Sequence, residues 1–284
     1  MMNYSNVLGL PRHIVEVLTR QRYQNNHDGL SVTRLIDHPH KIYLENKHDD
    51  QITVDVKDMM WSVLGSIGHG IIEGTDSVVT EFRVHCNEFA IPINGKIGAY
   101  DPITRTLFDN KFTSQYTLIY NKFGKPEWIM QLNIYAYMLR TVLGWPVEKI
   151  QVVAFLRDML SHDKNKAGRP DDDIQIVNLP VWPDDFCREF IRKRVELHQN
   201  YNPASGEYCD SDSRWKKATV YARIKEGGQR AIKLYDNLRD AHSDLKEGET
   251  IDVREGTDVR CAKYCPANRF CHYGKKYVPL YPMV

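Results

Sequence analysis

The stretch that decides the fold runs from residue 94 to residue 114 and reads NGKIGAYDPITRTLFDNKFTS. Two strand-like segments flank a short turn, so the pattern predicts a β-hairpin. The second strand carries Asp109 and Lys111, which point to the same face because they lie two residues apart. A carboxylate can hold a divalent cation, and an ammonium can orient a water near a developing phosphoryl charge. The hairpin thus carries part of the equipment of a metal-dependent phosphodiesterase.

The register of this hairpin places Gly98 opposite Asp109. With a turn at residues 102–105, directly opposed side chains lie about 5 Å apart on one face. A carboxylate at position 98 would therefore share a cation with Asp109. Asp101 lies roughly 10 Å further along the strand and points to the other face. Two acidic residues before the hairpin are alternative donors: Glu73 and Glu81.

The chain has 284 residues, a net charge of +1 and 42% hydrophobic residues, so it can bury a substantial core. Its apolar runs fall short of the roughly 20 residues of a membrane helix, and its first residues do not resemble a signal peptide. We therefore expect a cytoplasmic protein without a membrane segment. Bulk charge does not favour nucleic acid as a partner, although one local cluster is basic: Lys216, Lys217, Arg223, Lys225, Arg230 and Lys233.

The elements around the hairpin predict an α/β fold with the order helix, three antiparallel strands, helix, strand. Hydrophobic spacing predicts helices at 31–44 (with a break at Pro39), 56–74, 126–143 and 183–198. Strands are expected at 78–86, 89–100, 106–113, 150–156 and 174–181. The composition changes near residue 200, which divides the chain into a core of residues 1–200 and an extension of residues 201–284. The extension is expected to contain a hairpin around residues 227–228 and a helix near 237–246.

Two helices carry polar residues that can face the hairpin. His69 lies on the helix before it, and Gln131 and Tyr135 share one face of the helix after it because they lie four residues apart. Each feature alone is typical of an ordinary helix.

In this order the motifs resemble the RecB-type nucleases of the PD-(D/E)XK superfamily, in particular phage-encoded exonucleases related to the CRISPR adaptation nucleases. The resemblance covers most of the chain through five segments: SVTRLIDHPHKIYL, IGHGIIE, FDNKFTS, QLNIYAY and RCAKYCPANRFC. It implies that Mg²⁺ or Mn²⁺ is held by His69, Asp109 and the Asn110 carbonyl. It also implies a catalytic Lys111.

The resemblance further implies that Gln131 and Tyr135 contact DNA or brace the catalytic lysine. The family carries an Asp where this chain has Gly98, and the loss of a carboxylate should weaken Mg²⁺ binding. Two interpretations stay open. One is a DNA nuclease, foremost an exonuclease acting on DNA with a single-stranded end in processing or recombination, with a recombination or replication protein as partner. The other is a catalytically inactive nuclease-fold protein that binds DNA or a protein partner.

Aromatic residues are candidates for stacking on unpaired bases: Tyr116, Tyr120, Trp128 and Trp215. For Trp128 core packing is the expected alternative.

The C-terminal segment predicts a metal site, because Cys261, Cys265 and Cys271 fall within eleven residues. In a cytosolic protein clustered cysteines are more often metal ligands than disulfides. The resemblance implies a 4Fe–4S cluster, with Zn²⁺ as the alternative. Cys209 is favoured as fourth ligand because four thiolates are the commonest cluster set. The other candidates are two histidines: His38, which would favour Zn²⁺, and His272. A redox role is a third interpretation, against which the Asp-x-Lys motif argues.

Overall fold

The computed structural model describes residues 3–20, 29–73, 77–159, 166 and 168–278. The described chain forms two compact units. The sheet unit comprises Asn3–Pro39 and Thr53–Tyr201, and the cysteine unit comprises His40–Ile52 together with the residues from Asn202 onward. The segment His40–Ile52, which the sequence assigned to the N-terminal part, thus shares a unit with the C-terminal residues.

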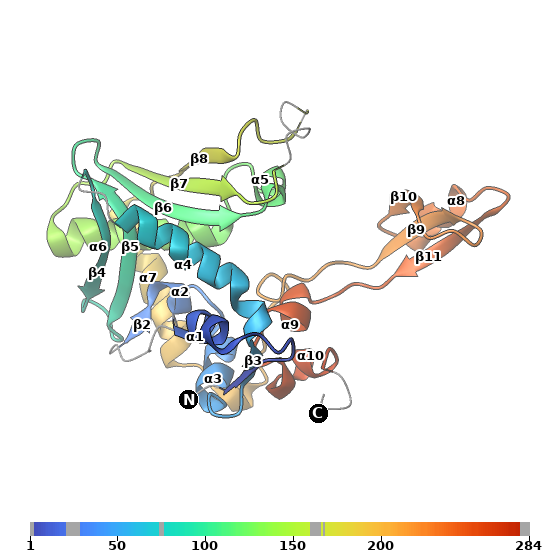
Figure 1. Cartoon of the computed structure of the whole chain (residues 1–284), viewed down its shortest axis with the longest axis horizontal. Helices are drawn as coiled ribbons and strands as arrows, with labels where there is room; N and C mark the ends of the chain where they lie inside the picture. Colours follow the sequence, from blue (N-terminus) through green and yellow to red (C-terminus); the bar gives the residue numbers. More distant parts are fainter. Residues whose placement is uncertain (1–2, 21–28, 74–76, 160–165, 167, 279–284) are drawn as a thin grey trace. The chain divides into compact units, whose positions relative to one another are not determined.

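A mixed six-stranded sheet forms the centre of the sheet unit (Figure 1). Its strands are β2 (Leu30–Ser31), β4 (Val79–Cys86), β5 (Ile93–Asp101), β6 (Thr106–Thr113), β7 (Lys149–Leu156) and β8 (Ile174–Leu179). β4, β5 and β6 form the predicted antiparallel set, and the sheet continues through β7, parallel to β6, to β8, antiparallel to β7. The predicted three-stranded sheet is therefore half of a larger one. A separate two-stranded parallel ribbon joins β1 (Asn3–Ser5) to β3 (Thr53–Asp55).

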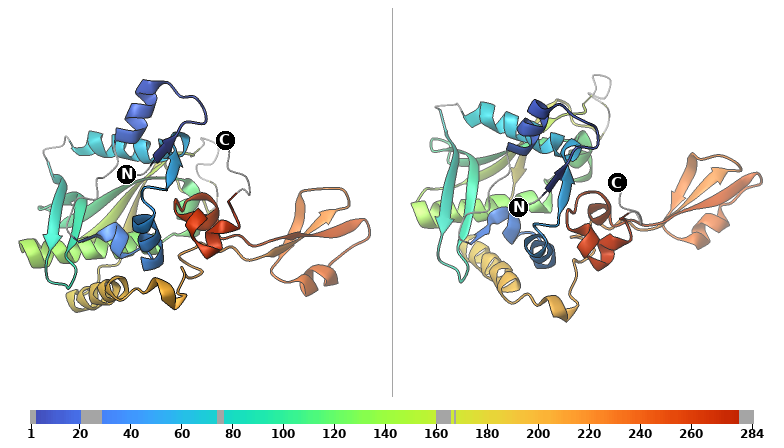
Figure 2. Two further views of the ribbon diagram at one scale, coloured as in Figure 1. Left: turned by 90° about the horizontal axis from the view of Figure 1, so that it is seen from below. Right: turned by 60° about the horizontal axis from the view of Figure 1, so that its bottom comes forward.

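Helices α4 (Met60–Glu73) and α6 (Pro126–Leu143) lie on opposite faces of this sheet, as Figure 2 shows. Pro126 and Glu127 begin α6 favourably, since proline fits the first turn and an acidic residue complements the helix dipole. Gly144, with φ of 68°, ends this helix in a left-handed cap. The remaining helices are α1 (Arg12–Arg20), α2 (Val32–Leu35), α5 (Gln115–Tyr120) and α7 (Asp184–Gln199), together with a 3₁₀ turn at Val56–Met59.

The predicted helix at residues 31–44 is two helices, because α2 ends before Pro39 and α3 (Pro39–Lys47) begins at it. Proline lacks the N–H that a helix interior needs, so the break at Pro39 follows from the chain chemistry. Ser31 caps α2 by accepting a hydrogen bond from the backbone N–H of Arg34.

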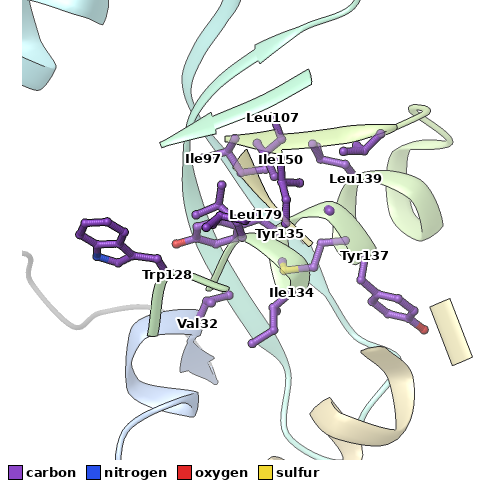
Figure 3. Packing of buried hydrophobic residues seen from close by; sticks show 14 of the residues in the cluster. Val32, Ile97, Leu107, Trp128, Ile134, Tyr135, Tyr137, Leu139, Ile150 and Leu179 are labelled. Atoms are coloured by element: carbon purple, nitrogen blue, oxygen red, sulfur yellow. The ribbon is translucent and has the colours of Figure 1, made fainter. Parts of the chain in front are cut away.

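The main core lies between α6 and the sheet (Figure 3). Every residue of α6 from Leu132 to Leu139 is buried, and Figure 3 shows several of them against Ile97, Leu107 and Ile150. Trp128 is also buried, so this residue packs in the core and its ring is not available to stack on bases. This packing fixes the position of α6 over β6, the strand that carries Asp109.

The cysteine unit contains a three-stranded sheet, a set of short helices and α3. The sheet has the order β10 (Ala231–Tyr235), β9 (Val220–Lys225), β11 (Glu249–Arg254), all antiparallel. The predicted hairpin at residues 227–228 is confirmed as the β9–β10 turn. The helical elements are α8 (Leu238–Ser243), α9 (Val259–Lys263) and α10 (His272–Lys275), with 3₁₀ turns at Pro203–Ser205 and Asn268–Phe270. Across both units, no helix in the described part of the chain is long and apolar enough to cross a membrane.

Candidate active site

The first half of the candidate site lies between β6 and α6. The Nζ atom of Lys111 lies 2.6 Å from Oδ2 of Asp109 and donates to Oε1 of Gln131 at 3.2 Å. Nε2 of Gln131 in turn donates to the Tyr135 hydroxyl at 3.4 Å. The side chain of Asp109 is only 9% exposed. The structure therefore brings together all four residues that the sequence proposed for catalysis.

The second half joins α4 to strands β4 and β5. Nδ1 of His69 lies 2.8 Å from Oε1 of Glu81, and Nζ of Lys96 lies 2.5 Å from Oε2 of the same carboxylate. The Glu81 side chain is 6% exposed. A buried carboxylate is thus held between an imidazole and an ammonium, which offset the cost of its burial.

Gly68 explains how His69 comes so close to the sheet. A Cβ atom at position 68 would lie 1.9 Å from the ring of Phe112 on β6. The absence of a side chain lets α4 pack directly on that ring, and the His69 and Phe112 rings then meet edge to face at 6.4 Å. This close helix–strand contact places His69 against β6, the strand that carries Asp109 and Lys111.

The hairpin register agrees with the sequence analysis. Asp101 pairs with Thr106, and the β5–β6 ladder ends at Ala99 and Phe108, one residue before Gly98 would meet Asp109. A Cβ atom at position 98 would lie 3.7 Å from Oδ1 of Asp109 and 3.1 Å from the Phe108 carbonyl oxygen. Position 98 therefore faces the Asp109 carboxylate, and the glycine leaves that side of it open.

Asp101 has a local role instead. Its carboxylate accepts hydrogen bonds from the Thr104 hydroxyl at 2.6 Å and the Ile103 N–H at 2.9 Å. The Thr104 hydrogen bond, with smaller contributions from backbone N–H groups, lowers the pKa of Asp101 below its ordinary value. Asp101 therefore stabilises its own turn. Of the other alternative donors, Glu81 lies in the site, and the Glu73 side chain falls outside the described residues.

The chemistry of these residues fits a hard divalent cation. Oδ2 of Asp109 is buried and receives no hydrogen bond of normal geometry, although the Lys111 ammonium lies beside it as an ion pair. Carboxylate oxygens and an imidazole are suitable ligands for Mg²⁺ or Mn²⁺. Within the described ranges, however, no three His, Cys, Asp or Glu side chains are gathered at metal-binding spacing. Two lysine ammonium groups lie against the two carboxylates instead.

The cysteine tail forms a second candidate site, in the other unit. Burial, together with the neighbouring sulfurs of Cys265 and Cys271, raises the pKa of the Cys261 thiol to about 11. Burial also raises the pKa of Cys265, with a contribution from Cys271. The three thiols predicted as ligands therefore influence one another electrostatically, although within the described chain they are not gathered at metal-binding spacing. A soft metal would have to deprotonate them.

A residue that the sequence analysis missed lies beside these thiols. Nε2 of His40 is 3.5 Å from Sγ of Cys271, although 231 residues separate them. In the sequence, the only indication that His40 could be a ligand is its position two residues after His38. Cys209 is partly buried, and its carbonyl accepts a hydrogen bond from Arg214. Its role as fourth ligand stays a prediction, as does that of His38.

Two of the proposed stacking residues are open to solvent in the sheet unit. Tyr116 and Tyr120 on α5 are 47% and 80% exposed, and their rings stack at 6.4 Å. The guanidinium of Arg169 lies 5.3 Å from the centre of the Tyr116 ring. Trp215, in the cysteine unit, is 41% exposed.

Two of the six cations in the basic cluster of the extension are paired with carboxylates. Arg223 is buried in ion pairs with Asp244 at 2.7 Å and Glu249 at 3.0 Å. Lys233 also pairs with Asp244, at 3.3 Å. These cations stabilise the small sheet and its helix, so the cluster has less charge to offer a nucleic acid than the sequence suggested.

No family model and no curated protein matches the chain, but solved structures resemble it. SSO0001 aligns over 67% of this chain and 86% of its own, with 16% identity and a TM-score of 0.45. A phage-related exonuclease from Haemophilus somnus 129PT aligns over 57% of this chain and 70% of its own, with 17% identity and a TM-score of 0.30. Both scores and both identities are low, so a functional conclusion has to rest on the residues of this chain.

Proposed function

We propose that the protein is a metal-dependent nuclease that hydrolyses phosphodiester bonds in DNA. The observation that carries this proposal is the position of the Lys111 ammonium, held between the buried Asp109 carboxylate and the Gln131 amide beside an open position. An ammonium fixed in this way can orient an attacking water and stabilise charge on a phosphoryl oxygen. Tyr135 supports it indirectly, because its hydroxyl accepts the hydrogen bond that orients Gln131.

Asp109, His69 and the Asn110 carbonyl would hold Mg²⁺ or Mn²⁺, which supplies Lewis-acid polarisation of the phosphate when bound. The site contains two carboxylates and two ammonium groups, so it is close to neutral before a cation enters. A divalent cation then adds two positive charges, which a phosphodiester of the substrate partly offsets. We therefore expect the cation and the DNA to bind more strongly together than alone.

The substrate we propose is DNA with a single-stranded end, degraded as by an exonuclease. The stacked, exposed rings of Tyr116 and Tyr120 support this choice, because aromatic faces bind unpaired bases with little sequence preference. A role in recombination or replication, with a protein partner from one of these processes, is the context that such a substrate implies.

The decisive experiment compares the wild-type chain with Lys111→Met on linear single- and double-stranded DNA in Mg²⁺ and in Mn²⁺. Methionine preserves most of the side-chain volume and removes the charge. We expect at least about a hundredfold loss of cleavage, a barrier increase of about 2.7 kcal/mol, with DNA binding retained in a mobility-shift assay. Equal cleavage by the two proteins would reject the proposed role of Lys111 and with it the nuclease assignment.

A second candidate function is a nuclease-fold protein that binds DNA or a protein partner without cleaving DNA. The observation that favours it is the pairing of both site carboxylates with lysines, at 2.5 Å for Glu81 and 2.6 Å for Asp109. DNA binding without cleavage in either metal, by a protein that retains its fold, would select this candidate.

For the cysteine tail we propose a structural metal site, with a 4Fe–4S cluster as the first choice and Zn²⁺ as the alternative. The donor set supports it, since three neighbouring thiols and the His40 imidazole are soft and borderline ligands. Cys209 and His40 are the candidates for the fourth position. Iron, sulfide and zinc analysis after anaerobic purification distinguishes the two metals, and a metal-free protein with reactive thiols would reject both.

A further inference from the structure

Strand β8 forms one edge of the six-stranded sheet (Figure 1). It pairs with β7 on its inner side, and within the described residues no other backbone segment hydrogen-bonds to its outer side. Every second residue of an edge strand directs its N–H and C=O groups outward. An edge of this kind is a template on which another strand can pair.

The sequence of β8 lacks the features that keep an edge strand from pairing. Its six residues, IQIVNL, include no charge and no proline. Charged side chains, prolines and irregular backbone are the usual protection of an edge. The other long edge strand of this sheet, β4, has that protection, because it carries Glu81 and Arg83 and because Glu81 adopts a φ of +51°. β8 is therefore open to pairing in a way that β4 is not.

The exposed face of β8 is apolar. Ile174 and Ile176 are 55% and 62% exposed, whereas Val177 and Leu179 on the opposite face are buried in the main core. Phe123, in the turn after α5, is 81% exposed and lines a groove of about 460 Å³ beside β8. Apolar side chains gathered along an open edge are typical of an interaction surface.

The charges along this edge differ between its two ends. The aspartates at 171–173 directly precede β8 and are exposed. The nearby Arg169 turns back toward α5, where it donates to the Gln115 side chain at 2.7 Å. The turn that carries Lys122 lies near the other end of the strand, since a Cβ atom at Gly124 would come within 2.3 Å of Leu179. Lys122 is exposed, so the edge has an acidic beginning and a basic end.

We propose that two copies of the chain associate through β8, with the two strands antiparallel about a two-fold axis. Antiparallel pairing brings the acidic beginning of each strand to the basic end of the other, so opposite charges meet at both ends. Parallel pairing would bring like charges together. The exposed isoleucines of the two copies then cover one another.

The two-fold axis also determines the register. An axis perpendicular to the sheet keeps equivalent faces on the same side, so one residue of β8 must pair with its own copy. Centring on Ile176 or on Val177 pairs most of the strand. Centring on Ile176 also keeps Pro180, which has no N–H, outside the paired segment. The Ile176 side chains of the two copies are therefore expected to lie opposite each other.

The inference goes beyond the proposed function and does not depend on it, but it places the candidate sites. Lys111 is in register with Ala154 on β7, and Ala154 is in register with Gln175 on β8. Lys111 thus lies two strands from the edge. In the dimer the two Lys111 residues lie on one face of a continuous sheet, five strand spacings or about 24 Å apart.

The test is the oligomeric state of the full chain, measured by sedimentation velocity and light scattering. One strand pair makes a small interface, so we expect a dissociation constant on the order of 10 μM. Ile176→Lys places a charge opposite its own copy and should weaken association by at least about tenfold. Ile103→Lys is the matched control, because Ile103 is 88% exposed in the β5–β6 turn, and it should associate like the wild type.

A charge exchange tests the antiparallel arrangement without altering β8. Lys122→Glu should weaken association by at least about threefold, since each surface pair contributes little but the two-fold axis repeats it. The double variant Lys122→Glu with Asp171→Lys should recover most of the loss. These two variants test the proposal even if circular dichroism shows that Ile176→Lys does not fold.

A wild-type chain that remains monomeric up to about 200 μM, well above the expected dissociation constant, would overturn the inference. A dimer that is equally stable in folded Ile176→Lys and in Lys122→Glu would also overturn it, because the interface would then lie elsewhere. A double variant weaker than Lys122→Glu alone would reject the antiparallel pairing. None of these measurements involves DNA, so a failure of the dimer leaves the proposed nuclease function standing, and a dimer that does not cleave DNA rejects only that function.

Discussion

At the scale of single residues, Asp258 holds the cysteine segment in place. Its buried carboxylate lies 3.0 Å from Nε of Arg214 and 2.8 Å from Nζ of Lys276, and it accepts a hydrogen bond from the Tyr277 hydroxyl at 3.2 Å. Burial alone would raise the pKa of Asp258, but the hydrogen bonds from Lys276 and Arg214 outweigh it and lower the pKa.

Asp258→Asn should therefore destabilise the protein by about 3 kcal/mol at pH 7, because it leaves Arg214 buried without its counter-charge. A lowered pKa means that this stabilisation is complete above the ordinary carboxyl pKa and is lost as the pH falls through the folded value. Urea unfolding of both proteins between pH 3 and pH 7 measures the difference, which should shrink with acidity. Asp252→Asn, in a half-exposed pair with Arg254, is the matched control and should cost under about 1 kcal/mol. Equal losses from the two variants would contradict this account.

At the scale of elements, the contact between α4 and β6 controls the site. The Phe112 ring that receives Gly68 is stacked on Phe155 at 4.8 Å, so it cannot turn aside freely. His69 follows directly on Gly68, and any shift of the helix moves its imidazole relative to Asp109. The site geometry thus depends on a glycine that carries no chemistry.

Gly68→Ala should lower stability by roughly 1–3 kcal/mol through overpacking and weaken Mn²⁺ binding by displacing His69. Gly70→Ala is the matched control on the same helix, because a Cβ atom there meets nothing within 4 Å. Alanine favours helix, so this control should gain roughly 0.5–1 kcal/mol. Thermal unfolding and Mn²⁺ titration of both variants provide the comparison. Similar behaviour of the two would show that the close α4–β6 approach does not control the site.

At the scale of the whole molecule, the chain enters the cysteine unit twice. Helix α3 belongs to it through contacts with the C-terminal segment: the His48 ring stacks on Phe270 at 3.9 Å, and His40 lies against Cys271. The small sheet β9–β11 is attached differently. Lys217 and Thr257 exchange backbone hydrogen bonds at 2.9 and 3.2 Å where the chain enters and leaves it.

Removal of residues 202–284 should therefore produce an unstable, aggregation-prone protein, because α3 loses its partners. Replacing residues 219–256 by a short glycine–serine turn should leave the melting temperature nearly unchanged, since the two ends of that segment already meet. Size-exclusion chromatography and thermal unfolding of the two deletions measure this contrast. A stable, monomeric 1–201 fragment would show that α3 needs no C-terminal partner.

The sequence by itself determined the central elements and the hairpin register. Strand alternation and the short turn are local, and they are enough to pair Asp101 with Thr106 and to bring Gly98 opposite Asp109. The helix carrying Gln131 and Tyr135 was predictable for the same reason, because a spacing of four residues defines a helix face. The order of these motifs then indicated which residues would converge on Lys111.

Only the tertiary structure decided which side chains from distant parts of the sequence lie around these motifs. Glu81, with a φ of +51°, contacts His69 and Lys96, and neither contact leaves a trace in hydrophobic periodicity. His40 reaches Cys271 because α3 packs with the C-terminal segment, a contact that spans most of the chain. Long-range contacts of this kind depend on how whole elements pack. That packing is determined by side-chain shape and burial, and the local spacing of residues does not reveal it.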